Sequence, residues 1–283
     1  MILDAAYCNI KENYKKLKKF GLSLYLEEIN NDKPVSTTHK LEDVDPNTIP
    51  IFIISFNRLK ALKKLLERLE NLNIPNPIII VDNNSSLPSL LTFLASTKYK
   101  VIRLKKNYGH LALWKAKEFR EIVNEQPFIL TDPDVIPSSN CPEDFIALFL
   151  KQLKKYPYST KVGFSLNLNT IPVNYAKREE VLNWEKKFWN DNLKFATDDI
   201  VEEKLDSTNS EKGKLCFYFA PIDTTFALYR PGIYPTADKW WNSLRIAPPY
   251  TADHLGWFPD YIVDDEMGCY HRHFKNRSSH WLK

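Results

Sequence analysis

From residue 49 to residue 153, short apolar runs alternate with longer segments in which apolar residues recur every three or four positions. The first kind is typical of strands buried on both faces, and the second is typical of amphipathic helices. The pattern predicts strands at 49–56, 77–84, 99–104 and 127–134, and helices at 59–72, 87–96, 110–123 and 140–153. Such alternation predicts a mostly parallel α/β sheet covered by helices on both faces.

The two flanks of this region follow less regular patterns. The segment NIKENYKKLKKF near the N-terminus predicts a helix with Ile10, Tyr14 and Leu17 on one face and lysines around it. That helix either packs on the main domain or rests on an anionic membrane. Later in the chain, strands are predicted at 161–168 and 215–230, and the stretch 174–213 has the character of an insertion.

Composition narrows the class of protein. Of 283 residues, 43% are hydrophobic and 26% are charged, as in soluble globular proteins. The net charge of +4 suits an anionic ligand or a bilayer surface, but no dense Lys/Arg stripe indicates a nucleic-acid binder. The four cysteines are scattered, which favours reduced thiols in a cytoplasmic protein. No apolar run reaches the roughly 20 residues of a spanning helix, so we expect a cytoplasmic chain, or one peripheral to the inner face of the membrane.

Polar residues follow all four of the first predicted strands. The groups are Ser55-Phe56-Asn57-Arg58, Asp82-Asn83-Asn84-Ser85, Asn107-Tyr108-Gly109-His110 and Asp132-Pro133-Asp134. Ligands of open α/β sheets bind outside the carboxyl ends of the strands. A turn explains any one of these groups, including Asp132-Pro133-Asp134, but it explains four together poorly. The sequence therefore predicts a binding site at this edge.

The residue types at this edge suit a nucleotide held through a metal ion. Asp132 and Asp134 can bind Mg²⁺ or Mn²⁺ together with phosphate oxygens. Arg58 can pair with phosphate, and Asp82 can accept hydrogen bonds from a ribose or a base. The sequence has no G-x-G-x-x-G after the first strand and no G-x-x-x-x-G-K-[ST]. A dinucleotide site and a P-loop enzyme are therefore not expected.

The motifs SFNR, VDNNS, NYGHLALWKA and DPD resemble those of GT-A-type glycosyltransferases close to family 2, over about residues 49–150. The resemblance implies one α/β GT-A domain with a Rossmann-like, mostly parallel sheet flanked by helices. Its parts are an N-terminal helical extension and linker (1–48), a nucleotide-sugar-binding half (49–150) and an irregular acceptor-binding half (151–283). It also implies inverting transfer from a nucleoside-diphosphate sugar, a UDP-sugar foremost, to a glycan or lipid-linked glycan in bacterial-type surface glycan synthesis.

The same resemblance assigns the donor side of the site. Asp82 contacts the nucleoside, Asp132 the ribose and the metal–diphosphate, and Asp134 binds Mn²⁺ or Mg²⁺. Four neighbouring residues are predicted to complete the donor site: Ser55, Asn57, Arg58 and Asn107.

The acceptor side is less defined by sequence. The Glu-Asp pair that the family places before a helix has no clear equivalent, and Asp264-Asp265-Glu266 is nearest to it in composition. Asp223, His254 and Glu266 are the candidate bases, with Asp223 favoured over His254. A histidine can instead complete the metal shell, and the candidates are His254, His271 and His273. Trp257, which offers a sugar ring an apolar face, and Arg245 are predicted to bind the acceptor.

Other functions stay open at this stage. A nucleotidyltransferase would be expected to carry a glycine-rich, lysine-bearing loop after the first strand. The segment SFNRLKALKK has no glycine, which disfavours that activity. A haloacid-dehalogenase-type phosphatase carries its Asp-x-Asp after the first strand of the core, whereas here the motif ends the fourth. A non-catalytic nucleotide- or carbohydrate-binding protein on a degenerate transferase fold is the remaining alternative, and metal-dependent hydrolysis of a nucleotide-sugar distinguishes it from an enzyme.

Overall fold

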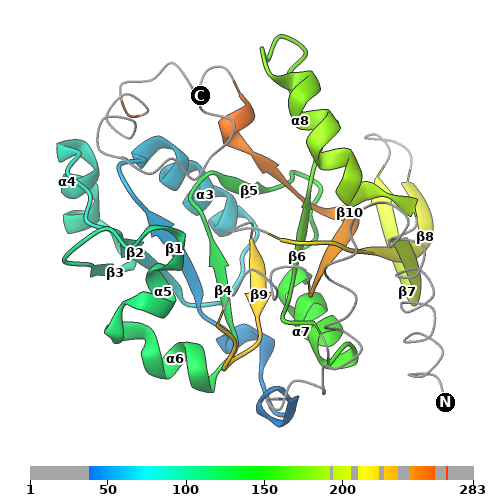
Figure 1. Ribbon diagram of the computed structural model, residues 1–283, viewed down its shortest axis with the longest axis horizontal. Coiled ribbons are helices and arrows are strands. Elements are labelled where there is room, and N and C mark those ends of the chain that lie inside the picture. The colour runs from blue at the N-terminus through cyan, green and yellow to red at the C-terminus, as the bar shows by residue number, and fades with distance from the viewer. Residues whose placement is uncertain are drawn as a thin grey trace.

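One mixed sheet runs through the computed structural model, with helices on both faces (Figure 1). The structure describes residues 38–157, 159–191, 194–204, 210–222, 226–234, 242–258 and 266. The strand order is β3-β2-β1-β4-β9-β6-β10-β8-β7, and β5 also pairs with β10. The predicted α/β class is therefore confirmed.

The first part of the sheet is parallel, as the apolar runs predicted. Its strands are β1 (Ile51–Ser55), β2 (Ile78–Asp82), β3 (Lys100–Arg103) and β4 (Phe128–Thr131). All five residues of β1 are buried, because the sheet is covered on both sides. Ile51 and Ile53 pack into the larger apolar cluster on one face, whereas Phe52 and Ile54 pack into a second cluster on the other face.

Each face of the sheet has its own helices (Figure 1). The helices α3 (Leu59–Asn71), α4 (Pro88–Ser96) and α7 (Phe145–Lys155) contribute to the larger cluster, and α5 (Ala112–Lys115) and α6 (Arg120–Glu125) to the other. Short 3₁₀ turns lie at η3 (Thr38–Leu41), η4 (Pro46–Thr48), η5 (Gly109–Leu111) and η6 (Lys117–Phe119). None of the helices in the described ranges has the length and hydropathy needed to cross a bilayer.

Two of the predicted helices differ from those observed. The prediction of one helix over 110–123 is wrong, because Ala116 adopts an extended ψ of 127° that separates α5 from η6 and α6. The predicted start of the next helix at residue 140 is also wrong, since α7 begins at Phe145. Pro142 disfavours a helical conformation for the residue before it, which explains the later start.

The second half of the chain extends the sheet with mostly antiparallel pairs. Its elements are β5 (Val135–Pro137), β6 (Lys161–Leu166), α8 (Arg178–Glu185), η7 (Lys186–Trp189), β7 (Lys194–Lys204), β8 (Ser210–Phe219), β9 (Ala227–Tyr229), β10 (Ser243–His254) and η9 (Leu255–Trp257). The strand β9 lies between β4 and β6 and is antiparallel to both, so it joins the two halves.

Sequence patterns described this half less well. The single strand predicted at 215–230 is wrong, because β8 pairs with β10 while β9 lies between β4 and β6. The stretch 174–213, expected to be an insertion, supplies α8, β7 and the start of β8. The long strand β10 was not predicted, and its pairing with β6 shifts register between Ile246 and Thr251, where the two prolines lie.

The strands β6 and β9 approach each other most closely at Gly163. A Cβ atom at this position would lie 2.5 Å from the carbonyl oxygen of Phe226 and 2.6 Å from Cβ of Ala227. The first is a backbone atom and the second is bonded directly to the backbone, so neither can turn away as the end of a flexible side chain would. Close approach therefore requires glycine here.

We predict that Gly163→Ala lowers the free energy of unfolding by about 1–3 kcal/mol, the usual cost of overpacking a core. Gly213→Ala is the matched control, because Gly213 is also in a strand and a Cβ there meets nothing within 4 Å. Urea denaturation of both variants measures the difference. Equal stability of the two variants would show that the β6–β9 contact relaxes without cost.

Candidate active site at the carboxyl edge of the sheet

The loop between β4 and β5 carries Asp132-Pro133-Asp134, and strand pairing brings the end of β10 beside it. The strand β5 is antiparallel to β10, with Val135 opposite His254. The backbone N–H of Leu255 donates to the carbonyl of Asp134 at 2.8 Å. His254 is the last residue of β10. The pairing places His254 and Asp134 at one point of the edge.

Three side chains meet at this point, and we call them the Asp134 cluster: Arg58, Asp134 and His254. Arg58 Nη2 lies 3.1 Å from Asp134 Oδ2, and His254 Nε2 lies 3.6 Å from the same oxygen. The side chain of Asp134 is only 6% exposed. Its burial raises the pKa of the carboxyl, but Arg58 and His254 outweigh this effect and hold the pKa below its usual value. Asp134 is therefore a buried carboxylate stabilised by neighbouring positive charge.

The donor atoms of the Asp134 cluster fit a small divalent cation. An octahedral ion with bonds of about 2.1 Å places adjacent donors about 3 Å apart and opposite donors about 4 Å apart. The 3.6 Å between Asp134 Oδ2 and His254 Nε2 falls between these two values, so the two side chains would have to approach each other by about 0.6 Å to become adjacent ligands of one ion. Among the described residues, no three His, Cys, Asp or Glu side chains gather as a complete protein-only site. Substrate oxygens and water would have to supply the other ligands, as they usually do for Mg²⁺.

Asp132 forms the turn that the sequence also suggested. Its carbonyl accepts from Val135 N at 3.4 Å and from the Thr131 hydroxyl at 3.0 Å, and its side chain is half-buried. The turn and the metal interpretations are compatible, because the turn uses the backbone of Asp132 and aims Asp134 at His254.

His254 is held by its aromatic neighbour. Its ring lies against Trp257 with centroids 5.0 Å apart and an interplanar angle of 32°. A Cβ on Gly256 would come within 2.6 Å of the histidine ring, so glycine leaves the ring its space. The Nδ1 atom is buried and has no hydrogen-bond partner among the described residues. The contacts fix the ring with Nε2 toward Asp134.

Asp82 and Ser55 lie side by side at the ends of β2 and β1. Asp82 is fully buried, and its Oδ1 accepts from Ser85 N at 2.9 Å, while Oδ2 lies 3.4 Å from Arg103 Nε. The Ser55 hydroxyl is also fully buried and has no hydrogen-bond partner in the described part of the chain. Arg103 is a residue that the sequence analysis missed, although a basic residue at the end of the neighbouring strand was a usable signal.

The asparagines of this edge shape the loops. Asn57, at a φ of 52°, accepts from the backbone of Ser86 at 2.8 Å and of Leu87 at 2.9 Å. Asn107 accepts from Gly109 N at 2.8 Å. Asn83, which the sequence analysis did not single out, accepts from Tyr108 N and donates to Gly109 O, so it ties the loops after β2 and β3 together. The donor-binding roles of Asn57 and Asn107 stay predictions.

The structure buries the two residues predicted to bind the acceptor. Trp257 is 2% exposed and lies in the core. Arg245 pairs with the buried Glu185 at 2.9 Å and donates from Nε to the carbonyl of Pro221 at 2.7 Å. These contacts give each residue a structural role, and acceptor binding stays a prediction.

Several candidate residues fall outside the described ranges. They are Asp223, Asp264, Asp265, His271 and His273. Glu266 is described, and its Oε2 accepts from Lys60 N at 2.9 Å in the first turn of α3, next to Arg58. Asp253 was not proposed as a site residue; burial raises the pKa of its carboxyl, and the Thr170 hydroxyl donates to it at 2.7 Å.

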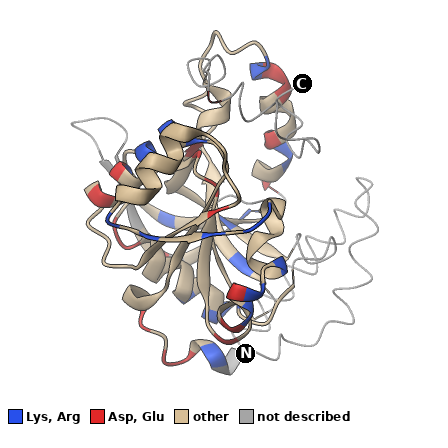
Figure 2. Cartoon of the chain, turned by 90° about the vertical axis from the view of Figure 1, so that its left-hand side faces the viewer, with Lys and Arg blue, Asp and Glu red and all other residues tan. Residues whose placement is uncertain are grey.

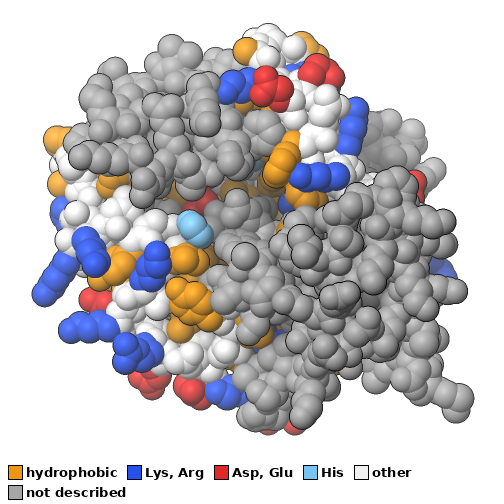
Figure 3. All heavy atoms as spheres, in the orientation of Figure 1, with side chains coloured by type: hydrophobic (Ala, Val, Ile, Leu, Met, Phe, Trp, Pro, Cys, Tyr) orange, Lys and Arg blue, Asp and Glu red, His pale blue; other side chains and the backbone are white. Residues whose placement is uncertain are grey.

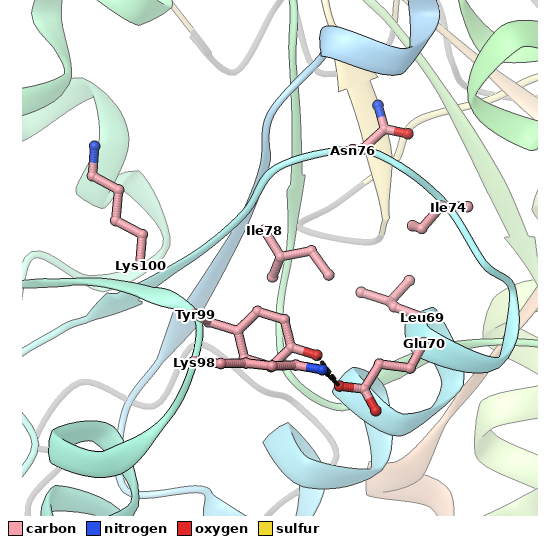
Figure 4. Close-up of a pocket in the computed structure, with 8 residues that line it drawn as sticks. All are labelled: Leu69, Glu70, Ile74, Asn76, Ile78, Lys98, Tyr99 and Lys100. Atoms are coloured by element: carbon pink, nitrogen blue, oxygen red, sulfur yellow. Dashed lines mark hydrogen bonds and ion pairs between the residues drawn. The ribbon is translucent and has the colours of Figure 1, made fainter.

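Two surface features lie away from the Asp134 cluster. A pocket of about 410 Å³ lies beside the amino ends of β2 and β3, at Ile78 and Lys100, where Lys98 pairs with Glu70 (Figure 4). Exposed basic residues follow the edge formed by β3 and the loop after it; Figure 2 marks basic positions along the ribbon, and Figure 3 shows lysine and arginine side chains on the surface. They include Lys100, Arg103, Lys105 and Lys106.

The family model that matches this chain is "Glycosyl transferase family 2", over residues 51–199, which is more than half of the 283 residues. The chain belongs to glycosyl transferase family 2. The predicted GT-A-type α/β fold and the predicted family are thus confirmed. The match begins at β1, covers both strand ends with Asp82 and Asp134, and ends within β7.

The similarity of this family 2 chain to solved structures is weaker than its match to the family model. One is residues 1–349 of TarS from S. aureus, with 13% identity, a TM-score of 0.37, and coverage of 76% of this chain and 63% of that one. Another is the mannosyltransferase PcManGT from Pyrobaculum calidifontis in complex with GDP-Man and Mn²⁺, with 15% identity, a TM-score of 0.32, and coverage of 60% and 49%. Both likenesses are too low to bear on the activity of this chain. Among curated proteins, none matches the sequence.

The Asp134 cluster predicts a specific dependence of stability on pH. Because the folded-state pKa of Asp134 lies below the ordinary value of 3.8, its carboxylate adds stability above that pH, which is lost as the pH falls through the folded pKa. We expect Asp134→Asn to cost about 3 kcal/mol at pH 7, as for a broken buried pair. The deficit should shrink below pH 4.

Urea denaturation at pH 7, 5 and 3.5 measures this effect. Glu179→Gln is the control, because Glu179 belongs to an exposed pair with Arg178 and should change stability by less than about 1 kcal/mol at every pH. A deficit of Asp134→Asn that stayed constant down to pH 3.5 would contradict a pKa lowered by Arg58 and His254.

Proposed function

We propose that this chain transfers a sugar from a nucleoside-diphosphate sugar to an acceptor hydroxyl at the carboxyl edge of its sheet. The observation that carries this proposal is the Asp134 cluster: one buried carboxylate oxygen faces Arg58 at 3.1 Å and His254 at 3.6 Å. Membership of glycosyl transferase family 2 supports the reaction class. A structural ion pair alone would not need a histidine aimed at the same oxygen.

Asp134 and His254 are the proposed protein ligands of Mn²⁺ or Mg²⁺, with Asp132 beside them. When bound, such an ion neutralises charge on the departing diphosphate as a Lewis acid. The role of this chain is to hold the two ligands in place, through the β5–β10 pairing and the stacking of His254 on Trp257. Of the roles left open for His254, that of ligand is favoured by its distance to Asp134.

The nucleoside is proposed to lie over the ends of β1 and β2. Asp82 would accept hydrogen bonds from it, and the buried hydroxyl of Ser55 is a polar group available beside Asp82. A UDP-sugar is the donor that we favour. Arg58, Asn57 and Asn107 complete this side, with Arg58 directed to phosphate.

Asp223 is the proposed base, and Glu266 is the alternative. The segment before Asp223 is anchored firmly: Arg245 donates to the carbonyl of Pro221 at 2.7 Å, and Ile222 N donates to Ser243 Oγ at 3.0 Å. A base removes the proton of the acceptor hydroxyl as the anomeric carbon is attacked, and a single such attack inverts that carbon. Inversion is therefore part of the proposal.

The acceptor is proposed to be a glycan or a lipid-linked glycan of a bacterial-type surface polymer. The exposed basic residues of the β3 edge support peripheral contact with an anionic membrane, where each lysine or arginine near the surface adds to binding. Cosedimentation with phosphatidylglycerol vesicles tests this contact.

We expect Mn²⁺ together with one of UDP-, GDP-, CMP- or dTDP-sugars to raise the melting temperature of the wild-type chain, and the same donor to be hydrolysed slowly. Asp134→Asn and His254→Ala should each abolish the Mn²⁺-dependent part of the shift and of the hydrolysis. Glu179→Gln serves as the control. Retention of most of the metal-dependent activity by Asp134→Asn would mean that Asp132-Pro133-Asp134 is only a turn.

Substitutions at Asp82 and Asp223 should separate binding from turnover. Asp82→Ala should weaken nucleoside-diphosphate binding by about 1.5–3 kcal/mol, the cost of losing a charged hydrogen bond. Asp223→Asn should lower kcat by at least about 10²-fold, a typical contribution of a general base, with donor affinity nearly unchanged. Calorimetric titration and steady-state kinetics measure the two effects. Near wild-type turnover of Asp223→Asn would contradict its role as the base and leave His254 and Glu266 as the candidates.

A further inference from the structure

The oxygen proposed to bind the cation already has a positively charged partner. Asp134 Oδ2 lies 3.1 Å from Arg58 Nη2, and the two side chains are 6% and 11% exposed. A cation bound to that oxygen at about 2.1 Å would lie no more than about 5 Å from the Arg58 nitrogen, by addition of the two distances. Little water is available to screen the repulsion, because both side chains are buried.

Charge balance disfavours the cation on its own. The Asp134 carboxylate is neutralised by Arg58 in the ion pair, so a divalent cation would leave the buried site with excess positive charge even with the Asp132 carboxylate beside it. A diphosphate brings negative charge of its own. The charges of the site can therefore be balanced in two ways. In the first, Arg58 pairs with Asp134. In the second, the cation binds Asp134, and Arg58 contacts a diphosphate bound next to it.

The position of Arg58 allows such an exchange of partners. Arg58 is the N-cap residue of α3, and its carbonyl accepts from Leu62 N at 3.2 Å, so the helix fixes its backbone. The first turn of α3 also favours anions: Lys60 N already donates to the carboxylate of Glu266 at 2.9 Å. A guanidinium leaving Asp134 would thus remain in a region that attracts phosphate.

We propose that Arg58 and the divalent cation are alternative partners of Asp134, and that Arg58 moves to the diphosphate when the donor binds. Arg58 is then a positioning residue that makes the binding of metal and of nucleoside diphosphate cooperative. The inference rests on the proposed function, because it assumes a cation at Asp134. If Arg58 were a fixed structural partner instead, its loss would not improve the binding of the cation alone.

The test measures Mn²⁺ affinity directly, from the electron paramagnetic resonance signal of free Mn²⁺, with and without saturating UDP or GDP. The variants are Arg58→Gln, which removes the charge, and Arg58→Lys, which keeps it. Arg178→Gln is the control, because Arg178 lies at the same 3.1 Å from the exposed Glu179. Circular dichroism confirms that each variant is folded.

Arg58→Gln should bind Mn²⁺ alone at least about fivefold more tightly than the wild type, the low end of typical coupling factors. The increase in Mn²⁺ affinity that the nucleotide causes should fall by at least about fivefold. Reciprocity requires Mn²⁺ to enhance nucleotide affinity by the same smaller factor in this variant. Arg58→Lys should keep weak binding of Mn²⁺ alone, and Arg178→Gln should match the wild type.

Two results would overturn the inference in distinguishable ways. Unchanged or weaker Mn²⁺ binding by Arg58→Gln, with binding abolished by Asp134→Asn, would refute the exchange of partners and leave the proposed metal site intact. The proposed metal site and the inference would both be refuted if the wild type and Asp134→Asn bound Mn²⁺ equally well. The same would follow if neither protein bound Mn²⁺ in the presence of nucleotide.

Discussion

A carboxylate can stay charged inside a protein only where positive charge or hydrogen-bond donors surround it. Asp134 meets this condition through Arg58 at the start of α3, and His254 at the end of β10 lies 3.6 Å from the same oxygen. These residues come from three separate parts of the chain, so the ion pairs require α3, the β4–β5 loop and β10 to be assembled correctly. One buried carboxylate thus brings together side chains from three segments at this edge.

The rest of the site follows from the packing on either side of this charge. The parallel strands β1 and β2 end at Ser55 and Asp82, and the loops beyond them are held by Asn57 and Asn83. On the other side, Arg245 and Ser243 anchor the chain that leads to Asp223. A deeply buried pair such as Arg245–Glu185 costs desolvation, so its value lies more in fixing this geometry than in stability.

Features that a local sequence pattern encodes were predicted, whereas features that depend on contacts between distant segments were not. The strands β1 to β4 and the helix α3 were predicted because their apolar residues are continuous or helically spaced. The strand β10 was missed because Pro248, Pro249, Asp253 and His254 interrupt any apolar pattern. Asp82 and Asp134 were recognised at strand ends, but the contact between Asp134 and His254 depends on the β5–β10 pairing, which no local pattern encodes. Likewise Trp257 was predicted to offer its face to a sugar ring, but tertiary packing that no local pattern encodes buries it.

The strand β9 has a consequence for how substrates enter. It bonds to β4 on one side and to β6 on the other, and it packs closely against β6 at Gly163. Opening the two halves like a hinge would break backbone hydrogen bonds along both edges of a fully buried strand. A rigid-body movement of one side of the sheet against the other would therefore have to break these hydrogen bonds and the close contact at Gly163. The loops beyond the strand ends lie outside this pairing, and their movement would admit a substrate while leaving the sheet intact.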